Sequence, residues 1–332
     1  MSHDKGKQRK QGGCAISDVT SQRPIFCIGT ATLDMISLLP AYPKANDRVL
    51  ATELLLSGGG PAATAAVTLS RLGHHVEMVT AVGDDEQGRF VMNGLAQEGV
   101  GTSHIKVVKM GRTAISQVIV NSETAERLII HMPGANVEEA LVDFNFDREA
   151  GWIHLDNRGY EALEKSGKQE LALNKHKISL DGGIHIDHLD LTNVDLYVPT
   201  ISELRNLFGQ TSSDLEVLMS AKSAGPLVVI ATDGPNGSYS LESTAPDDEP
   251  ALVHCEAFAG EIFSTLGAGD VFHGALLSEI IHDSDLRVAM TKANLCAFIS
   301  CRALDGRSGV PTAKELNSLF SLQRDTEGAT DE

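Results

Sequence analysis

The sequence has little positive charge and no long run of apolar residues. It contains 27 Lys and Arg against 45 Asp and Glu, which gives a formal net charge of −18 at pH 7. Such a surface repels phosphate backbones and anionic lipids, so we expect neither a nucleic-acid partner nor a membrane partner. No stretch approaches the roughly 18 consecutive apolar residues of a membrane span, and the first 23 residues lack the apolar segment of a signal peptide. A soluble protein is expected.

Cysteine is scarce and shows no pairing pattern. The chain has five cysteines, an odd number, with no CxxC spacing, and three of them lie in apolar runs. Reduced core thiols are therefore favoured over disulfides or a zinc site, which predicts a reducing, cytoplasmic location. The pair His185 and His188 has no supporting ligands nearby in sequence, and a surface loop explains it better than a metal site.

Two common phosphate-binding fingerprints are missing. The chain contains no GxxxxGK[ST] sequence, which excludes a P-loop enzyme. No GxGxxG follows the first predicted strand near residue 29, which argues against a dinucleotide-binding dehydrogenase. If the protein binds phosphate, another part of the chain must provide the site.

The chain does have enough apolar residues for a large core, at 42% of 332. From Ile25 onward, short β-branched runs alternate with longer helical patterns, which predicts an α/β fold with a mostly parallel central sheet flanked by helices. The predicted strands are 25–29, 76–82, 152–155, 177–181, 195–198 and 227–232. The predicted helices are 61–72, 88–97, 202–208, 268–281, 286–303 and 312–322.

Two stretches, 32–56 and 105–131, alternate apolar and polar residues as a sheet exposed on one face does. The second contains a predicted hairpin, with strands at 116–121 and 127–131. Both interrupt the α/β order, so we predict a small β-sheet lid above the main sheet. The expected organisation is one domain over 24–323, between disordered tails at 1–23 and 324–332.

The segment from Ser264 to Leu277 is the most informative part of the chain. Gly267, Ala268 and Gly269 precede a long apolar helix, where unpaired backbone N–H groups and the helix dipole favour an anion. Asp270 follows them. A carboxylate at this place is equally well explained as a partner of the helix dipole, which would lower its pKa. Beside an anion site, however, it is suited to accept a proton from a hydroxyl that attacks phosphorus.

This segment resembles the second signature of the ribokinase-like, or PfkB, family of carbohydrate kinases. The first signature has a counterpart in Gly58 to Ala66, followed by Arg71-Leu72-Gly73 and by Val82 to Asp85 with Gly88. The likeness runs in order from about Ile25 to Pro311. Within the family, both motifs look closest to the sulfofructose kinase branch.

The resemblance implies a ribokinase-like fold, ATP and Mg²⁺ as cofactors, and a monovalent cation as an optional further one. It implies that Asp34 binds sugar hydroxyls, that Gly58, Gly59 and Gly60 line the sugar, and that residues 267–269 hold the transferring phosphoryl group with Asp270 as base. The nucleotide site it implies comprises Thr232, Gly234, Gly237, Asn294, Gly306 and Gly309. Glu203 matches the final residue of an NxxE element that organises magnesium through water. Taken alone, the glycine triplet, Asp34 and Glu203 each have an ordinary explanation as turn or helix-end residues.

Some positions depart from the family pattern. Thr64 stands where the first signature usually has Asn, and Thr200 stands where NxxE has Asn. At the three positions where the sulfofructose branch has Lys, Asn and Arg for the sulfonate, this chain has Arg48, His131 and Arg158. The two arginines are equally well explained as ordinary surface residues.

The predicted activity is transfer of the ATP γ-phosphoryl group to a primary hydroxyl of a ketose or furanose, with an anionic sugar such as sulfofructose among the candidates. A neutral ketohexose, a ribose-like sugar and a nucleoside are the alternatives, and so is a non-catalytic scaffold that keeps the fold. The partners expected are the sugar and ATP, with a homodimer through the lid as a further option.

Overall fold

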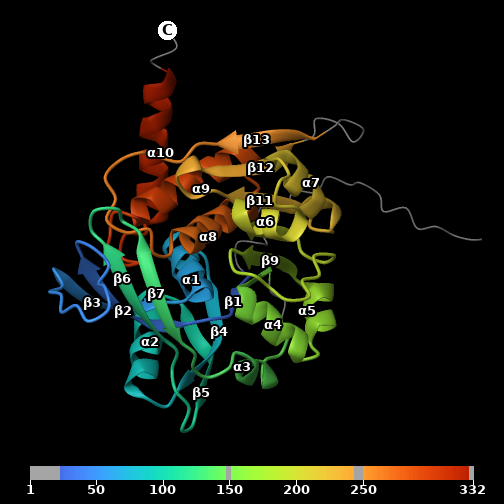
Figure 1. The fold of residues 1–332 in the computed structure, drawn as a ribbon. Helices are drawn as coiled ribbons and strands as arrows, with labels where there is room; N and C mark the ends of the chain where they lie inside the picture. The colour runs from blue at the N-terminus through green and yellow to red at the C-terminus, as the bar shows by residue number, and fades with distance from the viewer. Residues whose placement is uncertain (1–22, 147–150, 243–249, 329–332) are drawn as a thin grey trace, which may run out of the picture.

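The computed structural model describes residues 23–146, 151–242 and 250–328 (Figure 1). The predicted N-terminal tail, apart from Arg23, and the last four residues of the predicted C-terminal tail lie outside these ranges. None of the helices in the three ranges has the length and apolar character needed to cross a bilayer.

A nine-stranded sheet forms the centre, in the order β13-β12-β11-β10-β9-β8-β1-β4-β5. The strands from β11 to β5 are all parallel, while β12 and β13 add an antiparallel edge. Their bounds are β1 Ile25–Ile28, β4 Val76–Gly83, β5 Gly101–Val108, β8 Trp152–Leu155, β9 Lys177–Gly182, β10 Leu196–Pro199, β11 Val228–Thr232, β12 Ser238–Glu242 and β13 Ala251–Cys255. Parallel strands bring their carboxyl ends to one edge, where open α/β sheets bind ligands.

Helices cover both faces of this sheet, and Figure 1 shows the two groups on opposite sides. Side chains of β1 divide between them: Ile25 and Cys27 join one buried cluster, and Phe26 and Ile28 join the other. The first cluster packs against α1 (Pro61–Arg71), α2 (Glu86–Gln97), α8 (Ala268–Ile281), α9 (Leu286–Ser300) and α10 (Ala313–Gly328). The second packs against α3 (Glu138–Val142), α4 (Asn157–Lys165), α5 (Gln169–Lys175), α6 (Ile201–Phe208) and α7 (Asp214–Ser223). A strand buried on both faces explains the near-continuous apolar runs in the sequence.

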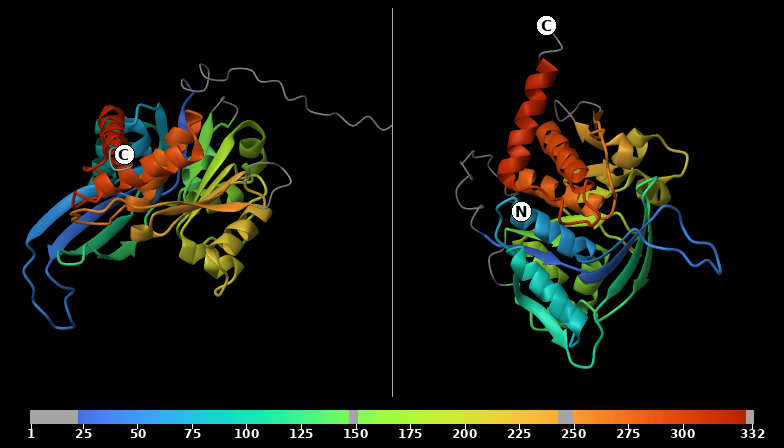
Figure 2. Two further views of the ribbon diagram at one scale, coloured as in Figure 1. Left: turned by 90° about the horizontal axis from the view of Figure 1, so that it is seen from above. Right: turned by 90° about the vertical axis from the view of Figure 1, so that its left-hand side faces the viewer.

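A separate four-stranded sheet, the lid, has the order β3-β2-β6-β7. Its strands are β2 (Thr32–Leu39), β3 (Glu53–Gly59), β6 (Ile115–Asn121) and β7 (Arg127–Met132). Figure 2 shows it projecting to one side of the main body. A small cluster around Ile36, Val118 and Val120 covers one face, and all six residues of β7 are exposed.

The α/β architecture and the β6–β7 hairpin are confirmed, and the predicted strands match within one or two residues. The predicted start of the second lid segment, at residue 105, is wrong because β5 pairs with β4 in the main sheet. β5 lies at the edge of the main sheet and is less buried than the central strands. Its exposed positions give it the alternating apolar and polar pattern that is typical of a lid strand. The sequence patterns also missed α3, α4, α5, α7, β12 and β13, and α10 continues to Gly328, beyond the predicted domain end.

Candidate active site

A cavity of about 470 Å³ lies at the carboxyl edge of the main sheet, under the lid. Three acidic residues line it: Asp34 from the lid, Asp181 at the end of β9, and Asp270 at the start of α8. Three residues that carry or can carry positive charge also line it, namely Arg127, His131 and Arg158. The cavity therefore combines groups from both sheets, and two of them, Asp34 and Asp270, lie more than two hundred residues apart in the sequence.

One end of the cavity is the turn that begins α8. Gly267 is the helix N-cap and has φ 72°, a left-handed conformation that strains any residue with a Cβ atom. A Cβ there would also lie 3.0 Å from the Cα of Gly306. Gly267, Gly269, Asp270 and Gly306 all line the cavity, so the first turn of α8 presents its backbone to it. Such a helix start is an anion-binding site.

Asp270 lies in this first turn and its carboxylate meets a mixed electrostatic environment. Burial, and next the nearby carboxylate of Asp181, raise the pKa of Asp270 well above that of an ordinary aspartate. Arg127 and Arg307 act in the opposite direction. The expectation that the helix terminus would lower this pKa was wrong, because desolvation disfavours the charged form more strongly. A raised pKa makes Asp270 a stronger proton acceptor once it is ionised.

Asp34 lies at the other end of the cavity, on β2. Its side chain is only 6% exposed, and Oδ1 accepts a hydrogen bond of 2.6 Å from Thr32 Oγ1. Burial raises the pKa of Asp34, and the Thr32 hydrogen bond and the charge of Arg307 oppose this. A Cβ on Gly59 would lie 2.0 Å from Asp34 Oδ2, so glycine is needed at this position for the backbone to approach the carboxylate. A buried carboxylate beside bare backbone is a suitable place for a polyhydroxyl ligand.

Asp156 holds together three backbone segments next to the cavity. It caps α4, and Oδ1 accepts from Gly159 N at 2.8 Å. Its Oδ2 accepts from Thr30 N at 2.7 Å and from Ala62 N at 3.4 Å. One buried carboxylate thus fixes the end of β1, the start of α1 and the start of α4, and with them the glycine turn between β3 and α1.

A family model described as pfkB family carbohydrate kinase matches residues 22–313. The chain belongs to the pfkB family of carbohydrate kinases. As a member, it is a phosphotransferase with an alcohol group as acceptor, and the sulfofructose branch is not shown by any comparison.

Relatives of this kinase cover almost its whole length. It is 26% identical to the deoxyribokinase of Salmonella typhi over 90% of this chain and 99% of that protein, and 26% identical to the ribokinase of Bacillus subtilis over 90% and 100%. Two solved structures share the fold. The Arabidopsis thaliana ribokinase complexed with ribose and ATP has a TM-score of 0.72 at 19% identity, over 90% of this chain and 98% of that one. A candidate ribokinase II from Escherichia coli with ATP and Mg²⁺ has a TM-score of 0.72 at 20% identity, over 90% and 99%.

The six residues predicted for the nucleotide lie in different surroundings, and two of them line the cavity. Thr232 and Gly306 line the cavity of this kinase. Gly234 is the first residue of the short helix η2 (Gly234–Asn236) and Gly237 is its C-cap, and neither lines the cavity. Asn294 is buried, and its Nδ2 donates to Ser238 Oγ and to the carbonyls of Cys255 and Glu256 at 3.0 to 3.1 Å, so its amide joins α9 to β12 and β13. Gly309 packs against the Ser300 backbone.

Glu203, predicted to organise magnesium, is 8% exposed in the first turn of α6. Its carboxylate accepts hydrogen bonds from His185 Nδ1 at 2.8 Å and from Asn206 Nδ2 at 3.2 Å. The hydrogen bond with Glu203 raises the pKa of His185. Thr200 caps the same helix through Oγ1 and lines the cavity. The threonine thus supplies the helix cap and also borders the cavity.

The three positions compared with a sulfonate site are not brought together. His131 and Arg158 line the cavity, whereas Arg48 lies exposed in the loop between β2 and β3. Arg158 Nη1 also pairs with Glu161 Oε2 at 3.0 Å. Only two of the three therefore face a ligand in this conformation.

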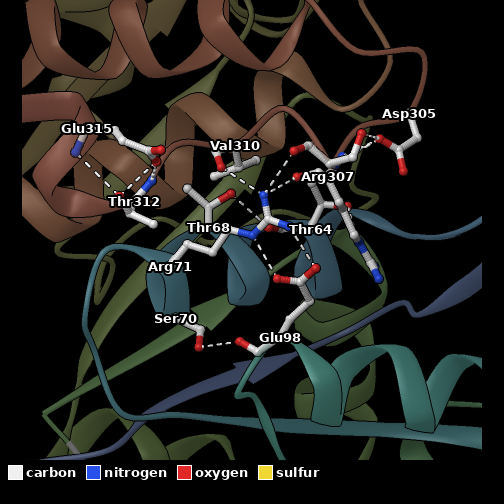
Figure 3. A network of polar contacts seen from close by, with 11 residues as sticks. Thr64, Thr68, Ser70, Arg71, Glu98, Asp305, Arg307, Val310, Thr312 and Glu315 are labelled. Carbon is white, nitrogen blue, oxygen red and sulfur yellow. Dashed lines mark hydrogen bonds and ion pairs between the residues drawn. The ribbon is translucent and has the colours of Figure 1, made fainter. Parts of the chain in front are cut away.

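Sequence reasoning missed Asp181, Arg127 and Arg307. Asp181 carried a detectable signal, since it directly ends a strand whose neighbours are buried. Arg127 is the first residue of the exposed strand β7, and its Nη1 donates to Thr265 Oγ1 at 3.0 Å, beside the α8 turn. Arg307 is only 5% exposed, packs against Gly58 and Gly59, and is not among the residues that line the cavity. Figure 3 shows it in the polar network around Arg71. Nothing in the sequence around it indicates burial.

Proposed function

We propose that this protein is an ATP- and Mg²⁺-dependent kinase that phosphorylates a primary hydroxyl of a pentose or related furanose or ketose sugar. The observation that supports the proposal is that one cavity is lined both by Asp34 with the Gly58–Gly60 turn and by Asp270 with the start of α8. One end suits a polyhydroxyl acceptor, and the other suits a phosphoryl group. The ribokinase and deoxyribokinase relatives make ribose and deoxyribose the first sugars to test.

Each group has a role in this mechanism. Asp34 binds sugar hydroxyls and orients the acceptor, while Asp270 takes the proton of the attacking hydroxyl. The backbone N–H groups at the start of α8 accept the charge that develops on the phosphoryl oxygens. The lid excludes water, which would otherwise compete with the sugar as acceptor.

Glu203 and Thr200 fit a magnesium ion that is held mainly by water and by the phosphates of the nucleotide. Its preferred ligands are oxygens, and Mg²⁺ is usually held by one or two carboxylates together with substrate phosphates and water. Among the residues that the structure describes, no cluster of three or more His, Cys, Asp or Glu could hold a metal alone. Glu203 and the Thr200 hydroxyl would therefore act through coordinated water, and the metal, when bound with ATP, would neutralise phosphate charge.

An anionic sugar such as sulfofructose is the second candidate. His131 and Arg158 on the cavity wall favour it, and the distant position of Arg48 weakens it. Arg48 would have to move with its loop to contact a sulfonate. A nucleoside is a third acceptor of the same chemical type, since it also presents a primary hydroxyl on a furanose.

ADP release over a panel of acceptors tests these alternatives. D-Ribose, 2-deoxy-D-ribose, ketohexoses, sulfofructose and nucleosides should be compared at equal concentration with ATP and Mg²⁺. We expect the largest stimulation with a pentose. Stimulation by sulfofructose alone would move the assignment to the anionic sugar. ATP binding without stimulation by any acceptor would contradict the kinase proposal and favour a scaffold.

We further propose that the lid mediates homodimerisation. Large apolar side chains are exposed on its outer strands, including Leu54 at 75% and Ile130 at 55%. Burying such a surface in a partner copy would remove it from water. Sedimentation of the wild type and of Ile130→Lys tests this, and a monomeric wild type at micromolar concentration contradicts it.

A further inference from the structure

A buried arginine lies directly behind the turn that is proposed to hold the sugar. Arg307 Nη2 donates to the Gly59 carbonyl at 2.7 Å, and Nε lies 3.4 Å from Thr64 Oγ1. A Cβ on Gly58 would fall 2.1 Å from Arg307 Nη1, so the guanidinium packs against the bare backbone of this turn. It therefore contacts the end of β3 and the first turn of α1 at once.

The loop that carries Arg307 is held from two sides, and Figure 3 shows the side formed by Arg71 and Glu98. Arg71 Nη1 donates to the carbonyls of Arg307, Ser308 and Val310 at 2.8 to 3.2 Å, and Glu98 holds the Arg71 guanidinium with two contacts of 2.7 Å. On the other side, Asp305 Oδ2 accepts from Ser57 Oγ at 2.6 Å. These contacts fix the loop backbone without using the side chain of Arg307, which leaves the guanidinium to act on the glycine turn.

Carboxylates from four segments of the chain surround the Arg307 charge. Asp34 on β2 interacts with it most strongly, followed by Asp305 in its own loop and Asp270 on α8, with Glu98 after α2 a weaker partner. Burial lowers the pKa of Arg307 to about 10, so the side chain is still a cation at neutral pH. Asp34 has few other compensating groups: the hydroxyls of Thr32 and Ser116, and His131, which lies two strands away in the lid sheet.

We propose that Arg307 is a positioning residue for the acceptor sugar, which fixes the Gly58–Gly59 backbone against Asp34 and holds a positive charge behind this turn. It does so without touching the ligand, because it lies outside the cavity wall. The inference rests on the sugar-binding role proposed for Asp34. A purely structural arginine would stabilise the fold through the same hydrogen bonds and leave the titration of Asp34 unchanged.

Two variants and one control separate these roles. Arg307→Met removes charge and hydrogen bonds, whereas Arg307→Lys keeps the charge and loses the fork that reaches both Gly59 and Thr64. Arg302→Met, at an exposed position nearby in the chain, is the control. In Arg307→Met we expect the KM for D-ribose to rise about tenfold or more with the KM for ATP within twofold of wild type. The lower-pH limit of kcat/KM for D-ribose should move to higher pH by about one unit. Arg307→Lys should restore most of the pH profile and only part of the KM.

A measurement that needs no turnover completes the test. The carboxyl ¹³C resonance of Asp34, assigned with Asp34→Asn, should titrate at higher pH in Arg307→Met than in wild type and in Arg302→Met. If wild-type protein releases no ADP with any sugar, the proposed function fails and this titration still decides the role of Arg307. An unchanged Asp34 titration in a folded Arg307→Met protein, or a KM for ATP that rises as much as that for D-ribose, would overturn the inference. If Arg307→Met does not fold, the same titration in Arg307→Gln decides, because glutamine is neutral but can still donate a hydrogen bond to the Gly59 carbonyl. The Asp34 carboxyl should again titrate at higher pH than in wild type, and an unchanged titration in the folded variant would overturn the inference.

Discussion

The two sheets of this kinase are built differently, and the active site uses that difference. Strands β1, β8 and β10 of the main sheet are buried throughout, between two layers of helices. In the lid, β7 is exposed throughout and only one face has a small core. Asp181 on the main sheet and Asp270 on α8, which packs against that sheet, lie in the deeply buried part of the molecule, and the lid carries Asp34, Gly58 and Gly59. The groups proposed for phosphoryl transfer therefore sit on this well-packed body, and those proposed for acceptor recognition sit on a thin, exposed sheet.

The strongest test of this division removes the base from the main sheet. Asp270→Asn keeps the shape of the side chain but cannot accept the proton, so kcat should fall by ~10² or more. ATP binding, measured by calorimetry, should stay within a few fold of wild type because the α8 turn is unchanged. Turnover close to wild type in this variant would refute the assignment of Asp270.

The second test compares the cores of the two sheets. Leu276 on α8 is fully buried beneath the main sheet, and Leu276→Ala should lower the free energy of unfolding by about 2–5 kcal/mol. Leu54 on lid strand β3 is 75% exposed, and Leu54→Ala should change it by no more than about 0.5 kcal/mol. Urea denaturation measures both. Equal losses of unfolding free energy in the two variants would show that Leu54 is packed as tightly as Leu276. A partner copy that covers the lid would have this effect.

The third test perturbs the lid side of the cavity. In Gly59→Ala the new methyl group would need Asp34 to move by about 1 Å, since its Cβ starts 2.0 Å from Oδ2. We expect the KM for the sugar to rise roughly tenfold, with that for ATP unchanged. Gly94→Ala on α2 is the matched control, because a Cβ there has no neighbour within 4 Å. Similar kinetics in the two variants would argue against close contact between Gly59 and Asp34.

The smallest expected effect concerns pH and Asp181. Burial, only partly offset by the hydrogen bond from Gly183 N, raises the pKa of Asp181 to about 6 from an ordinary 3.8. The folded protein therefore holds this proton more tightly than the unfolded chain, and the associated stability is lost as pH rises through about 6. Asp181→Asn should raise the Tm by roughly 2–4 °C at pH 7.5. The gain should shrink toward pH 4, and a gain that grows on acidification would contradict this origin.

Much of the main sheet could be predicted because its residues obey a simple rule. A strand such as Leu196–Pro199 is buried on both faces and is therefore apolar in every position, and helices such as Ala268–Ile281 begin at small residues that any reader of the sequence can find. The glycine turns that line the cavity were visible for the same reason. Their chemistry depends on local backbone geometry, which short motifs encode.

The parts that could not be predicted depend on tertiary packing. The edge strand β5 has the same alternating pattern as a lid strand, and only its pairing with β4 shows where it belongs. Arg307 becomes buried because Arg71, Glu98 and Asp305, which are far apart in sequence, hold its loop against α1 and the lid. The pKa of Asp270 depends on Asp181, 89 residues earlier in the chain. No local pattern contains these relations.

The backbone contact between Gly267 and Gly306 limits how this enzyme can diversify. A methyl group on Gly267 would collide with Gly306 and also approach Thr64 Cγ2 at 3.4 Å, while the left-handed φ angle penalises any larger residue. A side chain at Gly267 is therefore strained by its backbone conformation, and a Cβ at Gly306 would press on the backbone of Leu266 and Gly267 at 3.1 and 3.2 Å. Libraries that seek a new phosphate donor should leave this pair intact and vary the opposite wall, at residues such as Thr232 and Ile184.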